Sequence, residues 1–351
     1  MIERFEPRAL AVVAGHGYDT VIDVRSPAEY AEDHLPGAIN LPVLEDDERA
    51  RVGTIYKQVE PFAARKLGAA LVARNAARHL EGPLAAMPGG WRPLIYCWRG
   101  GQRSGSFATI LAQIGWRVAV LDGGYRTYRR LVVAAMHERP LPFRLVLLDG
   151  YTGTGKTDLL HRLGRTGVQV LDLEALANHR GSVFGRMSGG QPSQKAFEGA
   201  VAMALAGMDP ARPVLVEAES ALIGNLRVPA RLWKAMRAAP RIELTAPLSA
   251  RVARALRDHA EATGDPALLH RLVEGLRPLH PRDVVDGWSA MAAEGRLPDL
   301  AADLMQRHYD PRYARSRSGA APPIAVIDTG PEPGRGMDAA ALAAVAVLAD
   351  L

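Results

Sequence analysis

The sequence is poor in cysteine, because Cys97 is the only one among 351 residues. A single cysteine cannot form an internal disulfide, which excludes a disulfide-stabilised secreted scaffold. In a reducing cytoplasm this thiol stays free for chemistry. We therefore expect a cytoplasmic protein with one available thiol.

Long apolar runs are also missing. No stretch approaches the roughly 18 residues that a membrane-spanning helix needs, so no membrane partner is expected. The N-terminal segment carries Glu3 and Glu6 and lacks the apolar core of a signal peptide. Export by that route is not expected.

Lysine is scarce, and the basic residues are almost all arginine. The net charge of +5 and the pI near 9.5 permit a polyanionic partner without identifying one. Hydrophobic residues make up 48% and charged residues 23%, which is typical of a folded globular protein. The length suffices for two ordinary domains, but the oligomeric state cannot be inferred from the sequence.

The order of expected elements divides the chain in two. Residues 20–121 alternate short apolar strands with helices, which favours a parallel sheet covered on both faces. A short polar segment with two prolines, residues 137–142, marks the expected boundary between domains at 1–138 and 143–351. The alternation then restarts, and residues 250–309 are expected to be helical and rich in arginine. The predicted class is α/β throughout.

The segment Gly150-Tyr151-Thr152-Gly153-Thr154-Gly155-Lys156-Thr157 fits the phosphate-loop motif G-x-x-x-x-G-K-[ST]. It lies between a predicted strand and a predicted helix, which is the context that the motif requires. Its glycines let backbone N–H groups converge on phosphate oxygens, and the helix N-terminus adds positive potential. Lys156 is expected to contact a terminal phosphate, and Thr157 could hold a metal ion.

Acidic and basic groups follow the loop at strand and helix positions. Glu217 and Glu219 end an apolar strand and could orient Mg²⁺ or water, although acidic residues at strand ends are common. Asp172 and Glu174 end the preceding strand in the same way. Arg251, Arg254 and Arg257 share one helical face and could reach an anionic substrate, but a solvated helix face explains them nearly as well.

A second candidate site surrounds the single cysteine. Cys97 ends a predicted strand and is followed by a loop that leads into a helix, so backbone N–H groups and the helix dipole should stabilise its thiolate. The loop can cradle an anion, with Arg103 and Ser104 as further candidate catalytic residues. Its other members are Trp98, Arg99, Gly100, Gly101 and Gln102.

The first third of the chain resembles the rhodanese family. The resemblance rests on Asp23–Tyr30, on His34–Pro42, on Cys97–Ser104 and on Asp122–Tyr125. Five residues separate Cys97 from Arg103, where four are usual in sulfurtransferases. A loop of this length also occurs in rhodanese-related phosphatases, so its length alone does not assign the reaction.

A rhodanese-like domain joined to a phosphate-loop domain resembles the bacterial tRNA 2-selenouridine synthase family. Further matching stretches are Asp47–Gln58, Asp172–Gly185, which includes His179 and Arg180, Glu217–Ser220 and Tyr309–Tyr313. Asp172–Gly185 is the most diagnostic, because no general rule of nucleotide binding requires it. The resemblance covers nearly the whole chain.

This resemblance implies a tRNA-modifying transferase that converts wobble 2-thiouridine to 2-selenouridine. It implies S-geranylation with geranyl diphosphate, followed by selenation with selenophosphate. The phosphate loop would then stabilise the departing pyrophosphate, and Cys97 could accept selenium as an S-selanyl adduct. Both donors are co-substrates, Mg²⁺ is possible, and no tightly bound cofactor is expected.

Two other classes of enzyme stay open on the residues alone. One is a rhodanese-related cysteine phosphatase, which the long loop suggests. The other is a P-loop small-molecule kinase whose rhodanese-like domain serves only as a binding module. Release of phosphate from a phosphoester would reveal the first, and indifference to substitution of Cys97 would indicate the second.

Overall fold

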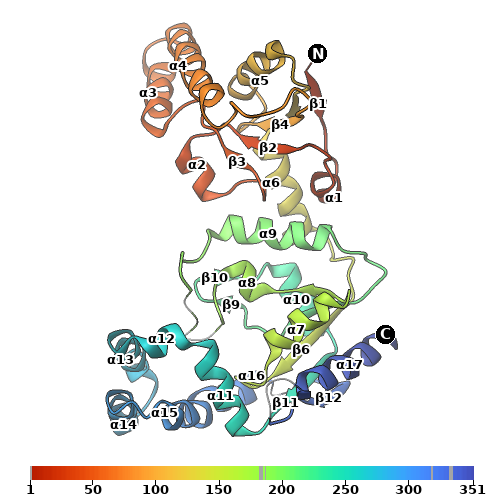
Figure 1. Cartoon of the computed structure of the whole chain (residues 1–351), viewed down its shortest axis with the longest axis vertical. Helices are drawn as coiled ribbons and strands as arrows, with labels where there is room; N and C mark the ends of the chain where they lie inside the picture. The colour runs from red at the N-terminus through yellow and green to blue at the C-terminus, as the bar shows by residue number, and fades with distance from the viewer. Residues whose placement is uncertain (1, 182–184, 186, 318, 332–334) are drawn as a thin grey trace. The chain divides into compact units, whose positions relative to one another are not determined.

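The computed structural model describes residues 2–181, 185, 187–317, 319–331 and 335–351, which form two compact units (Figure 1). Unit 1 comprises Met1–Pro140 together with Pro192–Gly207. Unit 2 comprises Leu141–Gln191 and Met208–Leu351. Among the described residues, no helix is both long and apolar enough to cross a membrane.

Unit 1 contains a five-stranded sheet in the order β1-β5-β4-β2-β3, and every pairing is parallel. The central strands are almost fully buried because helices cover the sheet, as the alternating pattern predicts. Strand β1, only three residues long, was not predicted from the sequence. The elements are β1 (Glu3–Phe5), α1 (Leu10–Ala14), β2 (Thr20–Asp23), α2 (Pro27–Glu32), β3 (Ile39–Asn40), α3 (Asp46–Gln58), α4 (Pro61–Glu81), β4 (Pro93–Tyr96), α5 (Gln102–Ile114), β5 (Ala119–Leu121), α6 (Tyr125–Val133) and the π-helix η1 (Ala134–Glu138).

Helix α9 (Gln194–Ala206) follows the phosphate loop in sequence but packs within unit 1. Its Glu198 forms an ion pair with Arg129, and Nε2 of His137 lies 3.2 Å from the same carboxylate. Gly199 faces Tyr128 so closely that a Cβ would stand 2.5 Å from the tyrosine hydroxyl oxygen. Charge pairing and this small contact residue hold α9 against α6.

Unit 2 contains a second five-stranded parallel sheet, in the order β12-β11-β6-β8-β7. Leucine and valine side chains of β6 and β8 pack under helices α7 and α17, which gives this unit its own core. Its first elements are β6 (Leu145–Gly150), α7 (Lys156–Arg165), β7 (Gln169–Leu171), α8 (Leu173–Ala177), β8 (Val214–Glu217), the hairpin β9 (Leu222–Ile223) and β10 (Leu226–Arg227), α10 (Ala230–Ala238) and β11 (Arg241–Thr245).

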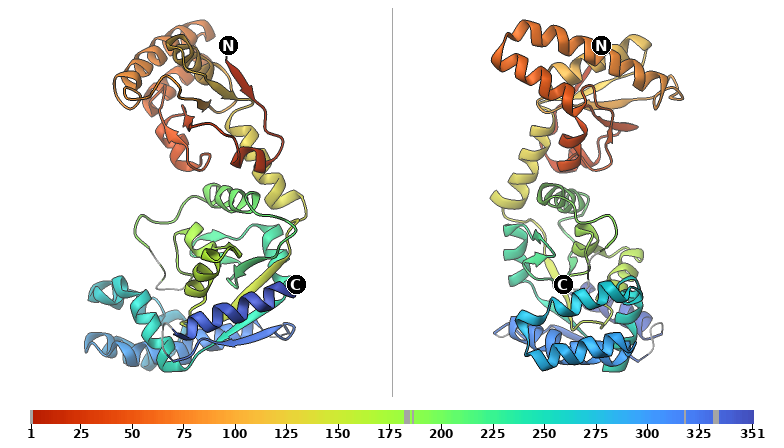
Figure 2. Two further views of the ribbon diagram at one scale, coloured as in Figure 1. Left: turned by 45° about the vertical axis from the view of Figure 1, so that its right-hand side comes forward. Right: turned by 90° about the vertical axis from the view of Figure 1, so that its left-hand side faces the viewer.

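The remaining part of unit 2 is mainly helical, as predicted. Several of these helices pack around Trp288, which is fully buried and donates its indole N–H to Asp303 at 2.8 Å. Both views in Figure 2 show them gathered beside the strands of the unit. They are α11 (Leu248–Asp258), α12 (Ala260–Gly264), α13 (Pro266–Glu274), η2 (Arg277–Leu279), α14 (Arg282–Ala293), α15 (Leu297–Leu304), η3 (Met305–Tyr309) and α16 (Asp310–Ser316), before β12 (Ala325–Asp328) and α17 (Arg335–Ala349).

Candidate functional site

The cysteine loop lies at the carboxyl end of β4, where parallel sheets commonly place their sites. Cys97 is 4% exposed, and the Ser104 hydroxyl donates to its Sγ over 3.2 Å. The Tyr125 amide donates to the Cys97 carbonyl oxygen at 2.8 Å. A Cβ at Gly124, where φ is +60°, would stand 2.3 Å from that oxygen. The loop is therefore held by a segment distant in sequence, which only glycine allows to approach.

Several effects act on the pKa of Cys97. Burial raises it, but the Ser104 hydroxyl, the N–H groups of Ser104 and Arg99 and the charge of Arg103 together bring it below its ordinary value. A larger fraction of the thiol is therefore ionised near neutral pH. This arrangement suits a nucleophile or a carrier of a soft atom such as sulfur or selenium.

The other residues of the cysteine loop are divided between its interior and its surface. Arg103 forms an ion pair with Glu29 at 2.7 Å, and so its charge is partly neutralised. Trp98 stacks on Tyr125 with ring centroids 5.2 Å apart. The exposed members are Arg99, Gly101 and Gln102, whereas Gly100 is partly buried with a positive φ of +67°.

Sequence reasoning missed the support beneath this loop. Arg25 is 1% exposed, pairs with Asp23 at 2.6 Å and lies over the Tyr125 ring at 4.2 Å. Tyr125 also donates its hydroxyl to Asp33 at 2.7 Å. Asp23, Arg25 and Tyr125 occur within the rhodanese-like stretches and Asp33 lies between two of them, but the contacts among these residues depend on the folded sheet.

The phosphate loop connects β6 to α7 in unit 2. Its glycines at 150, 153 and 155 have φ angles of +150°, +82° and +91°, and Cβ atoms there would meet neighbouring atoms within 2.8 Å. Lys156 folds back and donates from Nζ to the Gly150 carbonyl oxygen at 2.8 Å. Thr154 is buried and donates to the Tyr151 carbonyl oxygen. The loop thus has the tight glycine-dependent shape that converging N–H donors require.

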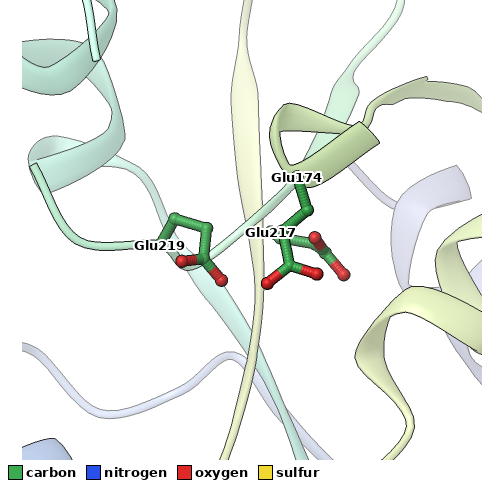
Figure 3. Close-up of side chains that lie close together, drawn as sticks. All are labelled: Glu174, Glu217 and Glu219. Carbon is green, nitrogen blue, oxygen red and sulfur yellow. The ribbon is translucent and has the colours of Figure 1, made fainter. Parts of the chain in front are cut away.

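Three glutamates meet beside the loop, as Figure 3 shows. Glu174, Glu217 and Glu219 each offer a carboxylate oxygen, and these oxygens lie within 4.8 Å of one another. Glu217 is fully buried, and the Thr157 hydroxyl donates to its Oε1 at 2.7 Å. Within the described part of the chain, its Oε2 has no hydrogen-bond partner.

Burial and close approach disfavour negative charge on the carboxylates of this cluster. Burial and repulsion between the carboxylates raise the pKa of Glu174 and Glu217 above the ordinary value. Burial opposes the charge of Lys156, but Tyr313 and the three glutamates raise its pKa. An oxygen-binding cation would relieve this repulsion, and an orphaned carboxylate oxygen is the ligand it prefers.

Two described residues of the Asp172–Gly185 stretch, Glu174 and Gly181, lie at this cluster, and residues 182–184 lie outside the described part. Asp172 caps α8, accepting from the Ala175 amide at 2.8 Å, and binds His161 at 2.6 Å. A Cβ at Gly181 would stand 2.5 Å from Glu174 Oε1, so this glycine lets the chain pass over the carboxylates.

The next two candidates in this stretch differ in exposure. His179 is 7% exposed, and its backbone amide donates to the Glu174 carbonyl oxygen at 3.0 Å. Arg180 is exposed, with its amide bonded to the Gly185 carbonyl oxygen at 2.8 Å. The structure thus brings His179, but not the side chain of Arg180, into the interior near the cluster.

The arginines of α11 support the phosphate loop from behind. Arg251 donates to the Thr152 carbonyl oxygen at 2.8 Å and pairs with Asp310 at 2.6 Å. Arg254 is fully buried and donates to the Thr154 carbonyl oxygen at 3.2 Å. Their charges are directed at the loop's own backbone, so an outward reach toward an anionic substrate does not fit these positions. Only Arg257 lies on the surface, 52% exposed.

Two groups near the loop were not predicted as site residues. Arg317 pairs with Asp149 at 2.5 Å and lies over the Tyr313 ring at 4.4 Å. Lys156 Nζ lies 5.4 Å from the centroid of the same ring. The Tyr309–Tyr313 stretch was noticed in the sequence only as a family match. In the structure, Tyr313 lies beside Tyr151 and Lys156 of the phosphate loop, and Asp310 pairs with Arg251.

A reactive-thiol loop on one parallel sheet and a phosphate loop with clustered carboxylates on another define a protein of combined rhodanese and P-loop type. The model of the rhodanese-like domain matches residues 10–131, and that of the tRNA 2-selenouridine synthase AAA domain matches residues 143–271. The chain belongs to the tRNA 2-selenouridine synthase family. The expected family and fold class are confirmed.

Curated relatives agree with this assignment. The tRNA 2-selenouridine synthase of Shewanella loihica is 38% identical over 86% of this chain and 87% of its own length. That of Pseudomonas syringae pv. syringae is 33% identical over 85% and 88%. The Hahella chejuensis protein of the same name is 40% identical over 73% of this chain. The match spans slightly under two thirds of the Hahella chejuensis and Nitrosomonas europaea relatives, 66% and 64%.

Proposed function

We propose that this chain is a transferase that converts 2-thiouridine to 2-selenouridine at the wobble position of tRNA. The relatives above are named tRNA 2-selenouridine synthase. The observation that carries the proposal is the presence, in one chain, of a thiol with a lowered pKa and a phosphate loop beside three clustered carboxylates, of which Glu217 is buried. The two sites suit a soft-atom transfer and the departure of a phosphate group.

The first step assigned to unit 2 is S-geranylation with geranyl diphosphate. The thiouridine sulfur forms a bond to the allylic carbon while the carbon–oxygen bond to diphosphate breaks. The leaving diphosphate takes the bonding electrons, so its negative charge grows in the transition state. Lys156, whose ammonium is held at the Gly150 carbonyl oxygen, and the loop N–H groups would stabilise that charge.

Mg²⁺ fits the donor set beside the loop. Thr157, Glu217 and one or both of its neighbouring glutamates would hold it, because the buried Oε2 of Glu217 has no hydrogen-bond partner among the described residues. Bound there, Mg²⁺ would neutralise part of the charge on a diphosphate. Lys156 keeps its own role as a donor to the departing oxygens.

The second step is assigned to Cys97. Selenophosphate supplies selenium to the nucleoside, the geranylthio group leaves as geranylthiol, and water takes up the phosphoryl group to give phosphate. The low-pKa thiol and the amide-lined loop would bind and orient selenophosphate while its selenium bonds to the nucleoside carbon and the carbon–sulfur bond breaks, so no bond between sulfur and selenium is required.

The direct test uses tRNA that contains 2-thiouridine. Nucleoside analysis should detect S-geranyl-2-thiouridine after incubation with geranyl diphosphate, and 2-selenouridine once selenophosphate is added. Phosphate release from a simple phosphoester, without either nucleoside product, would instead favour the cysteine phosphatase. Phosphate transfer from ATP to a small molecule would favour the kinase.

We predict that Glu217→Gln weakens binding of Mn²⁺, used as a spectroscopic substitute for Mg²⁺, by at least about tenfold in the presence of pyrophosphate. The substitution removes a buried anionic ligand but keeps its shape. Electron paramagnetic resonance measures free Mn²⁺ directly. Thermal stability should not fall, because repulsion within the cluster decreases.

The matched control is Glu294→Gln, an exposed carboxylate that pairs with Arg296 in the same unit. It should leave Mn²⁺ binding unchanged. If Glu217→Gln binds Mn²⁺ as tightly as the parent does, the carboxylate cluster is not the metal site.

A further inference from the structure

An apolar pocket opens in the helical part of unit 2, and Thr152 of the phosphate loop is one of its lining residues. Its cavity volume is about 60 Å³, and Thr152 lines it together with aliphatic side chains of the surrounding helices. The aliphatic residues most relevant here are Leu256, Leu269, Leu300, Leu304 and Met305. Apolar lining of this kind favours a hydrocarbon group over a nucleobase or a sugar.

Helix α11 connects the pocket to the phosphate loop. Arg251 on this helix holds the Thr152 carbonyl oxygen at 2.8 Å, and Ala255 and Leu256 on the following turn form part of the pocket wall. Four residues of helix span roughly 6 Å. The apolar pocket therefore begins about one helical turn from the residue that holds Thr152 of the phosphate loop.

The size of the pocket limits what it can enclose. One water takes about 10–15 Å³ of cavity measured in this way, so the pocket has room for roughly four to six non-hydrogen atoms. One five-carbon isoprene unit matches that space. A second unit would lie at the open mouth, and longer chains would extend into solvent.

We propose that this pocket binds the hydrocarbon tail of a short prenyl diphosphate whose head group binds the Gly150–Thr157 loop. This inference rests on the proposed function and adds the residues that select the length of the chain. Each buried methylene group strengthens binding by roughly fourfold. Filling the pocket with a larger side chain should therefore remove the contribution of the hydrocarbon tail to the binding affinity and leave the contribution of the diphosphate unchanged.

The test is Ala301→Phe, since Ala301 is a small, partly exposed wall residue outside the buried core cluster. Calorimetry with the full chain would compare geranyl diphosphate with inorganic pyrophosphate. We expect geranyl diphosphate to bind the parent at least about tenfold more tightly, and this preference should vanish in Ala301→Phe while pyrophosphate affinity stays. The matched control is Ala302→Phe, the next residue of α15, which does not line the pocket and should keep the preference.

A second variant, Leu256→Ala, enlarges the pocket and should shift preference toward farnesyl diphosphate. Retention of the geranyl preference in Ala301→Phe would overturn the proposal, as would an unchanged chain-length order in Leu256→Ala. Different results would contradict the proposed function and the proposed pocket. Binding of geranyl diphosphate in the pocket without any transfer to tRNA would refute the function, and unaltered geranylation by Ala301→Phe would refute the pocket.

Discussion

Replacing Cys97 with serine is expected to abolish formation of 2-selenouridine while S-geranylated tRNA accumulates. Loss of a side chain on which a chemical step depends commonly lowers the rate by about three orders of magnitude or more. Geranylation should stay within a few-fold of the parent, because the phosphate loop belongs to the other compact unit. Nucleoside analysis of each half-reaction measures both effects.

Ser104→Ala is the graded control for this result. It keeps the thiol but removes the hydroxyl that donates to Sγ over 3.2 Å. The pKa of Cys97 should rise, so less thiolate is present at any pH below it. The pH at which selenation reaches half its maximum should therefore move upward. A normal yield of selenouridine from Cys97→Ser would show that selenium transfer does not need this thiol.

Lys156→Ala is expected to slow geranylation by roughly 10²–10³-fold, the usual cost of losing one preorganised donor to a developing anion. Selenation of tRNA that already carries the S-geranyl group should change much less. The assay supplies pre-geranylated tRNA with selenophosphate alone and compares the variant with the parent. Removal of the ammonium also exposes the three glutamates to stronger mutual repulsion, so thermal unfolding must confirm that the variant is folded.

Lys234→Ala is the matched control, an exposed lysine on α10 of the same unit. It should leave both half-reactions intact. Equal loss of geranylation and selenation in folded Lys156→Ala would contradict a division of labour between the loops. A single anion site serving both steps would then replace the two-site mechanism.

Local sequence patterns predicted most of the strands that carry the two candidate sites. The buried run before Cys97 became β4, and the run before the glycine loop became β6. The acidic end of Val214–Glu217 was also recognised as the end of a strand. These predictions succeed because a strand buried on both faces must be apolar along its length, and its turn must contain the residues that permit its backbone angles.

Local sequence patterns could not predict hydrogen bonds between residues that lie far apart in the chain. Arg251 and Arg254 share a helical face, and their spacing fits a solvent-facing or ligand-facing role equally. The fold buries both side chains. Arg251 donates to a carbonyl oxygen 99 positions away in the chain, and Arg254 donates to one 100 positions away. Packing of α11 against the phosphate loop determines that these arginines are buried, and the periodicity of α11 by itself does not predict it.

The sequence by itself determined the α/β class, the free thiol, the phosphate loop and, through resemblance, the family. Each depends on residues close together in the chain, where backbone geometry and short-range spacing restrict the possible structures. Only the tertiary structure brought Glu174 to Glu217 and Glu219, set Gly124 against Cys97, placed α9 in unit 1 and opened an apolar pocket beside Thr152. These features arise because buried groups must find space and partners across distant segments, and that choice is made when the whole core packs.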